Sequence, residues 1–173
     1  MKTKLNMDSY VKIVFLQGSQ NKTNNTNNTN QKETKVELKA PKKAIMLSGT
    51  IANMIRDTPQ EDDKIPIENV RPEIMEKVIE YCIFHCEKHS EDEEREWDRN
   101  FFNSLSREVL FECTLAADFL HIQSLLDSGC KRIADSIRGK SVQEMREYFG
   151  VKNDFTPEEE EQIKRENEWL LDD

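Results

Sequence analysis

Alternating apolar and polar positions predict a small β-sheet near the beginning of the chain. Residues 10–16, YVKIVFL, are rich in β-branched and aromatic side chains and precede a Gln-Gly-Ser turn signal. In residues 34–39, Val36 and Leu38 alternate with charged residues, as expected of a hairpin partner with one buried face. Residues 65–67, Ile-Pro-Ile, fit a short edge strand, because proline cannot donate within a central ladder. We therefore expect three strands.

A low-complexity tract separates the first two predicted strands. Residues 19–32 consist largely of Asn and Thr and contain no apolar side chain. Such a segment cannot offset its ordering entropy by burial, so we expect a disordered insertion in the hairpin loop. Its Asn-x-Thr triplets would accept glycans only in the secretory pathway, and we assign no site to them.

Apolar residues spaced three and four apart predict helices over most of the remaining chain. Two short helices follow Pro41, the second with Ser48 as its N-cap. A long helix begins near Pro72 and is expected to end near His89.

After residue 89 the sequence predicts a charged linker followed by three helices. Residues 90–96 are expected to form a linker, followed by a short aromatic helix that packs on the body. Ser106 then caps a helix reaching Leu120, which is the most hydrophobic segment and is expected to be central. The next helix, 122–137, stops at Gly139.

Two capping boxes predict a helical appendage, residues 139–173, after a compact body of residues 1–138. The segments SVQE at 141–144 and TPEE at 156–159 both have the hydroxyl and carboxylate spacing that caps a helix start. The last helix is expected to reach about Leu171.

The last helix has few apolar residues of its own. Isolated helices of this length are marginal, and packing of an apolar face normally supplies their stability. We infer that another polypeptide covers the apolar side chains of the appendage, which is then fully ordered only in a complex. A tail folded onto its own domain is the alternative.

Length, composition and charge narrow the class of protein. The 173 residues, 36% hydrophobic and 34% charged, suit one domain with a thin core and an appendage. Residues 1–50 carry nine basic and three acidic side chains, which leaves a net charge of −15 on residues 51–173. That acidic body disfavours binding to nucleic acid or to anionic membranes. The chain also lacks an apolar run of 18 residues and a recognisable signal peptide, so we expect a cytosolic or nuclear protein.

Candidate catalytic and metal-binding residues are few. Cys82, His85, Cys86 and His89 lie on roughly one helix face, but the outer two are about 10 Å apart along the axis, too far to share one zinc ion. We predict no metal and no other cofactor, and expect the four cysteines to be reduced. The chain has no GxSxG and no glycine-rich phosphate loop, so we expect no catalysis.

Several stretches together resemble the S-phase kinase-associated protein family, the adaptor subunit of SCF-type cullin-RING ubiquitin ligases. They are IPIENV (65–70), KVIEYC (77–82), WDRNFF (97–102), LFECTLAADFLHIQSLLD (110–127) and NDFTPEEEEQIKRENEW (153–169). The resemblance implies an α+β BTB/POZ fold, with a small three-stranded sheet and a helical cluster, followed by two C-terminal helices. It also implies two partners, a cullin scaffold and F-box proteins.

The resemblance places cullin-binding residues at Asp118 and Phe119. The family usually has Asn-Tyr there, so this chain lacks a hydroxyl and carries an added charge. Cullin affinity could therefore differ even if the binding mode is kept.

The resemblance also assigns F-box-binding residues in the appendage. The apolar residues of this set would be the anchors, and Trp169 would be the strongest of them. Asn153 is expected to form a hydrogen bond with the backbone at the bend between the helices. The set is Val142, Met145, Phe149, Val151, Asn153, Phe155, Ile163 and Trp169. For Trp97, Phe101 and Leu110 we expect a role in the chain's own core.

The sequence leaves three further points open. An elongin C-like adaptor of a different cullin complex is the alternative, although that class lacks the two final helices. A weak homodimer of the unbound protein is also possible. Pro157 matches a proline that some protist relatives hydroxylate and glycosylate, but its place at a helix start is sufficient explanation.

Overall fold

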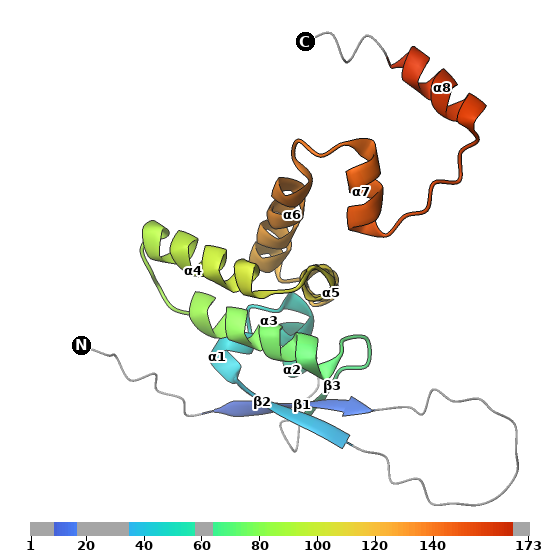
Figure 1. The fold of residues 1–173 in the computed structure, drawn as a ribbon. Helices are drawn as coiled ribbons and strands as arrows, with labels where there is room; N and C mark the ends of the chain where they lie inside the picture. Colours follow the sequence, from blue (N-terminus) through green and yellow to red (C-terminus); the bar gives the residue numbers. More distant parts are fainter. Residues whose placement is uncertain (1–8, 17–34, 58–63, 168–173) are drawn as a thin grey trace, which may run out of the picture. The chain divides into compact units, whose positions relative to one another are not determined.

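A computed structural model describes residues 9–16, 35–57 and 64–167 (Figure 1). The predicted Asn/Thr insertion, most of the acidic loop before the third strand, and Trp169 lie outside these described residues. The chain divides into two compact units, Met1–Ile133 and Ala134–Asp173.

The predicted three-stranded sheet is confirmed. Strand β1 (Tyr10–Leu16) lies between β2 (Lys35–Pro41), which is antiparallel to it, and β3 (Lys64–Pro66), which is parallel. Ile13 faces Leu38 on one side and Ile65 on the other. Strand β2 extends to Pro41, where an edge position tolerates a proline.

Helices make up most of the described chain. They are α1 (Lys42–Ile45), α2 (Gly49–Asp57), α3 (Pro72–His85), α4 (Glu91–Ser104), α5 (Arg107–Phe119), α6 (Gln123–Ile137), α7 (Val142–Phe149) and α8 (Pro157–Glu166). The two short helices after Pro41, the proline start of α3 and the Ser106 cap of α5 were all predicted. Within the described residues, no helix is both long and apolar enough to span a membrane.

Two boundaries differ from the sequence-based prediction. Helix α3 ends at His85, before His89, and its C-cap is Cys86. The prediction of a linker at residues 90–96 is wrong, because Ser90 caps α4. Its hydroxyl accepts from the Glu93 N–H, and the Glu93 carboxylate accepts from the Ser90 N–H in return. Acidic residues in the first turn favour the positive end of the helix dipole, so charge density here signals a helix start.

The core of the first unit lies between the sheet and helices α3 and α5. The inward residues of β1 alternate along the strand, and Ile13 is fully buried. Met75 and Val78 of α3 are also fully buried. Helices α3 and α5 contact one another, and α3 also contacts β2. The helices of this unit stand on one side of the sheet in Figure 1.

An aromatic cluster joins α4 to this core. The Tyr81 ring lies 5.7 Å from that of Phe101, centroid to centroid, and Trp97 stacks on Phe101 at 5.0 Å. Phe101 and Leu110 are buried, and Trp97 packs half-buried against the same cluster. The expected core role of these three residues is confirmed.

The second unit contains both helices of the appendage. Ser141 and Thr156 form the two predicted capping boxes, and Gly150 ends α7 with a φ of 68°. That left-handed conformation strains any residue with a side chain. Helix α8 ends at Glu166, earlier than the predicted end near Leu171, which lies outside the described residues. Both helices form in the single chain.

Candidate protein-binding surfaces

Apolar side chains stand exposed on the α7–α8 segment, residues 142–167. None of the residues of α7 or α8 is buried. The large exposed hydrophobic residues are between 41% and 65% accessible to solvent; they are Val142, Phe149, Val151, Phe155 and Ile163. Five large apolar groups exposed within one short segment make it a candidate interaction surface.

Helix α7 presents part of this set on one face. Val142, Met145 and Phe149 are spaced three and four residues apart, and residues at that spacing are neighbours on a helix surface. Met145 is half-buried, and the other two are exposed. A helix face of this kind fits a hydrophobic groove or a partner helix.

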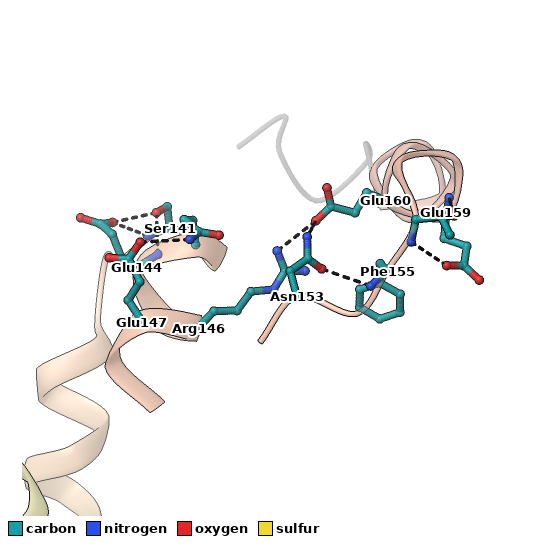
Figure 2. Close-up of polar contacts among 10 residues, drawn as sticks. Ser141, Glu144, Arg146, Glu147, Asn153, Phe155, Glu159 and Glu160 are labelled. Atoms are coloured by element: carbon teal, nitrogen blue, oxygen red, sulfur yellow. Dashed lines mark hydrogen bonds and ion pairs between the residues drawn. The ribbon is translucent and has the colours of Figure 1, made fainter. Parts of the chain in front are cut away.

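An ion-pair network joins the two helices of the segment (Figure 2). The Arg146 Nη1 atom on α7 donates to the Glu160 Oε1 atom on α8 at 2.9 Å. Asn153 Nδ2, from the link between the helices, donates to the same oxygen at 2.9 Å. We call these three residues the tail clasp. The bonds from Arg146 and Asn153 lower the pKa of Glu160.

The clasp also shapes the link between the helices. The side-chain amide oxygen of Asn153, Oδ1, accepts from the backbone N–H of Phe155 at 3.3 Å, which confirms the predicted bond of Asn153 to the backbone. The Arg146 guanidinium carbon lies 5.9 Å from the centre of the Phe155 ring, within range of a cation–π contact. Asn153 therefore orders the segment that carries the exposed apolar groups. Trp169, the predicted anchor, lies outside the described residues.

The sequence-based prediction missed Arg146 and Glu160. Fourteen positions separate them, so no helical or strand spacing connects them. Glu160 stands in a run of four glutamates, which by pattern alone is a solvated face. Only the fold distinguishes the residue that pairs with Arg146 from its neighbours.

A second exposed surface lies on α5. Asp118 is exposed, and Phe119 is 37% exposed although it ends a helix whose other face is buried. Leu115, four residues before Phe119, is 71% exposed. The helix is central, but Leu115 and Phe119 lie on its outer face.

A shallow hollow of about 140 Å³ continues this surface toward α3. Leu115 and Ala116 line it on one side, and Val70 and Arg71 on the other. Arg71 Nε and Nη2 donate to the two carboxylate oxygens of Glu112, each at 2.7 Å, and this two-pronged bond closes one rim. The α5 surface thus combines apolar groups with a charged border, as protein interfaces do.

The described residues contain no group of three or more side chains placed to hold a metal ion. His85 Nε2 instead lies 2.8 Å from Asp98 Oδ1, and His89 Nε2 lies 3.1 Å from the Phe84 carbonyl oxygen. All four cysteines are free thiols, and burial raises the pKa of the Cys82 thiol to about 12. A buried thiol held in its neutral form is a poor nucleophile.

Comparisons with known proteins agree with these features. Residues 35–87 match the tetramerisation domain of the Skp1 family, a POZ domain, and residues 123–170 match the dimerisation domain of the same family. The first match confirms the predicted α+β BTB/POZ fold.

Curated relatives extend over most of the chain. The E3 ubiquitin ligase complex SCF subunit sconC of Talaromyces marneffei is 40% identical over 153 residues, 82% of this chain and 95% of the relative. The SCF ubiquitin ligase complex protein SKP1a of Dictyostelium discoideum is 46% identical over 142 residues, 76% of this chain and 87% of the relative. This protein belongs to the Skp1 family.

Proposed function

We propose that this protein is a noncatalytic adaptor of an SCF-type ubiquitin ligase, which links a cullin scaffold to F-box substrate receptors. The observation that carries the proposal is the α7–α8 segment, which is ordered by its own caps and clasp yet leaves its large apolar side chains exposed. Two relatives that cover most of the chain are named as SCF ligase subunits, which supports the same role.

The α7–α8 segment is the proposed F-box surface. Its apolar groups come from three places along the chain, with Phe149 on α7, Phe155 in the link and Ile163 on α8. A binding energy concentrated in a few large apolar anchors fits this distribution. The eight residues assigned to F-box binding from the sequence remain a proposal, and Trp169 is the largest anchor among them.

The outer face of α5 is the proposed cullin surface. Phe119 and Leu115 supply the apolar contact, and Asp118 supplies a charge at its edge. A charge at the border of an interface chiefly alters the association rate and its dependence on salt. Since Asp118 and Phe119 lie in the first unit and the F-box surface in the second, one chain offers both partners separate sites.

The elongin C-like alternative is less well supported. Residues 141–166 form two capped helices, and the family match extends over residues 123–170. Elongin C-like adaptors lack the two final helices, so they have no counterpart of that segment. The proposal also includes a cytoplasmic and nuclear location, which imaging of the tagged protein tests.

Reconstitution tests the function directly. The full chain, a cullin N-terminal domain and an F-box domain should elute together in size-exclusion chromatography as a 1:1:1 complex. Phe119→Ala should remove the cullin domain alone, and Trp169→Ala should weaken F-box binding by about 2 kcal/mol or more. A preparation that binds neither partner, or that self-associates through the α7–α8 segment even with F-box domain in excess, would refute the adaptor role.

A further inference from the structure

The beginning of α2 is hydrogen-bonded to the end of α5, next to Phe119. The Gly49 N–H donates to the His121 carbonyl at 3.2 Å, and the Thr50 N–H donates to the Leu120 carbonyl at 3.3 Å. The Thr50 hydroxyl also donates to the Phe119 carbonyl at 2.9 Å. We call residues 48–50 and 119–121, taken together, the α2–α5 clamp.

The clamp pairs backbone groups that a helix cannot satisfy internally. The first N–H groups and the last C=O groups of every helix have no partner within it, and they carry opposite partial charges. Here the free donors of α2 meet the free acceptors at the end of α5. Three successive carbonyls, at residues 119, 120 and 121, are held in this way. The backbone that carries Phe119 is therefore fixed from outside its own helix.

The close approach of the two segments depends on Gly49. A Cβ atom added at Gly49 would lie 3.2 Å from the His121 Cβ, closer than ordinary van der Waals contact. His121 itself has a φ of 51°, and within the described residues it is the one non-glycine residue with positive φ. The chain thus turns sharply between α5 and α6, and the clamp holds that turn.

Ser48 and Thr50 have different roles in the clamp. Ser48 is fully buried, donates to the Leu120 carbonyl at 2.7 Å, and accepts from the Ile51 N–H as the cap of α2. Loss of its hydroxyl would therefore unfold a helix start as well as release the turn. Thr50 is half-buried, and its hydroxyl bonds to Phe119 and His121.

The Thr50 hydroxyl and the His121 ring share a hydrogen bond in which the ring is the donor. The Thr50 Oγ1 atom lies 3.0 Å from His121 Nδ1. A hydroxyl has one proton, and a carbonyl oxygen only accepts, so the proton of Thr50 goes to Phe119. His121 Nδ1 must then carry a hydrogen and donate to Thr50. The Thr50 hydroxyl thus donates one bond, to Phe119, and accepts one, from His121.

We propose that Thr50 is a positioning residue for cullin binding: its hydroxyl fixes the Phe119 carbonyl and thereby holds the Phe119 side chain in the orientation that the cullin contacts. This inference rests on the proposed function of the α5 surface. Thr50 is assigned no contact with the cullin itself.

Two variants of Thr50 separate positioning from folding. Thr50→Val keeps the shape of the side chain and loses the hydroxyl, whereas Thr50→Ser keeps the hydroxyl. In calorimetric titration of the full chain with a cullin N-terminal domain, Thr50→Val should weaken binding about three- to tenfold, and Thr50→Ser should stay within about twofold of wild type. The affinity for an F-box domain should be unchanged in both variants, and the thermal midpoint of Thr50→Val should fall by no more than about 2–4 °C, as the loss of one hydrogen bond predicts.

A double variant identifies the route of the effect. If Thr50 acts through Phe119, adding Thr50→Val to Phe119→Ala should cause no further loss of cullin affinity. A further loss equal to that of Thr50→Val alone would overturn the inference, as would a Thr50→Val variant that binds cullin normally or loses both partners together. If Phe119→Ala itself binds cullin normally, the proposed cullin surface is wrong instead. A nitrogen-15 spectrum that assigns the Nε2–H tautomer to neutral His121 would contradict the bonding scheme.

Discussion

The two units of this protein use the same kinds of residues in opposite ways. In the first unit, large apolar side chains such as Met75 and Ile13 are fully buried between the sheet and the helices. In the second, Phe149 and Phe155 are about half exposed, and the helices are held by caps and by the tail clasp. Burial therefore stabilises the first unit, whereas the second unit has little buried apolar surface of its own, and we propose that a partner supplies it.

The magnitudes of the interactions support this division. Burying a large apolar side chain contributes about 1.5–3 kcal/mol, and the first unit buries many of them. A helix cap contributes about 1 kcal/mol, and isolated helices shorter than about 12–15 residues are marginal in water. Helices α7 and α8 have 8 and 10 residues. The second unit is therefore expected to open locally far more often than the first.

Met75→Ala should have the largest effect on stability, because it leaves a cavity in the core of the first unit. We expect the free energy of unfolding to fall by about 2–5 kcal/mol, measured by urea denaturation. Exposed Met46, 43% accessible, provides the matched control, and Met46→Ala should change stability little. Equal losses from both variants would mean that the core does not lie where the structure places it.

Phe149→Ala should weaken partner binding and leave stability unchanged, whereas Met75→Ala lowers stability. The change should weaken F-box binding by about 2 kcal/mol in calorimetric titration, because an exposed aromatic anchor is truncated. The urea midpoint should stay the same. Lys152→Ala, an exposed position in the link between the helices, is the control for binding. A Phe149→Ala variant that unfolds more easily would show that Phe149 belongs to the protein's own core.

Glu160→Gln should loosen the second unit by removing the charge that Arg146 and Asn153 contact. Amide exchange in α7 and α8 should become faster, while exchange in α3 and α5 stays unchanged. Glu161→Gln is a matched control, because the Glu161 carboxylate makes only a 3.9 Å contact with Arg165 at an exposed site. Identical exchange in the two variants would show that the clasp does not hold the segment.

Low pH should weaken the contacts of Glu160 with Arg146 and Asn153. Because the folded pKa of Glu160 is lowered, its contribution to stability is fully present above the ordinary glutamate pKa of about 4.3 and is lost as pH falls through the lower folded value. Amide exchange in α8 of the wild type, corrected for intrinsic rates, should thus be constant from pH 7 to 5 and accelerate below about pH 4. In the Glu160→Gln variant, which has no carboxylate to protonate at this position, amide exchange in α8 should accelerate less below about pH 4 than in the wild type.

Ser90→Ala and Ser141→Ala should have the smallest effects, since each removes one helix cap. Each should cost about 1 kcal/mol locally. Loss of the Ser90 cap should fray only the first turn of α4, because Trp97 and Phe101 hold the rest of that helix. Loss of the Ser141 cap should speed exchange throughout α7, which has no buried residue. Equal, confined fraying in both helices would contradict the contrast between the units.

The features predicted correctly from the sequence are those that depend on residues only a few positions apart. The alternation in residues 10–16, the Ser106 cap and the two capping boxes of the appendage all lie where expected, because spacing of a few residues determines them. Residues 90–96 were misinterpreted because their charge density obscured the Ser90 capping box. Family resemblance, rather than periodicity, selected Asp118 and Phe119.

Features that join distant residues could not be predicted from local pattern. The exposure of Leu115 depends on which face of α5 packs against α3, and an apolar residue in an apolar helix gives no sign of this. The pairing of Arg146 with Glu160 and the clamp between Thr50 and Phe119 join positions 14 and 69 residues apart. Such contacts follow from the packing of whole elements.

Hydrogen exchange of the full chain, alone and with an F-box domain, is the most direct test of the adaptor account. Alone, the amides of α3 and α5 should exchange slowly, and those of residues 142–167 should exchange orders of magnitude faster. The F-box domain should slow exchange in residues 142–167 and leave α3 and α5 as they were. A free protein in which α7 and α8 are already as protected as α3, with no change on adding the F-box domain, would contradict the account.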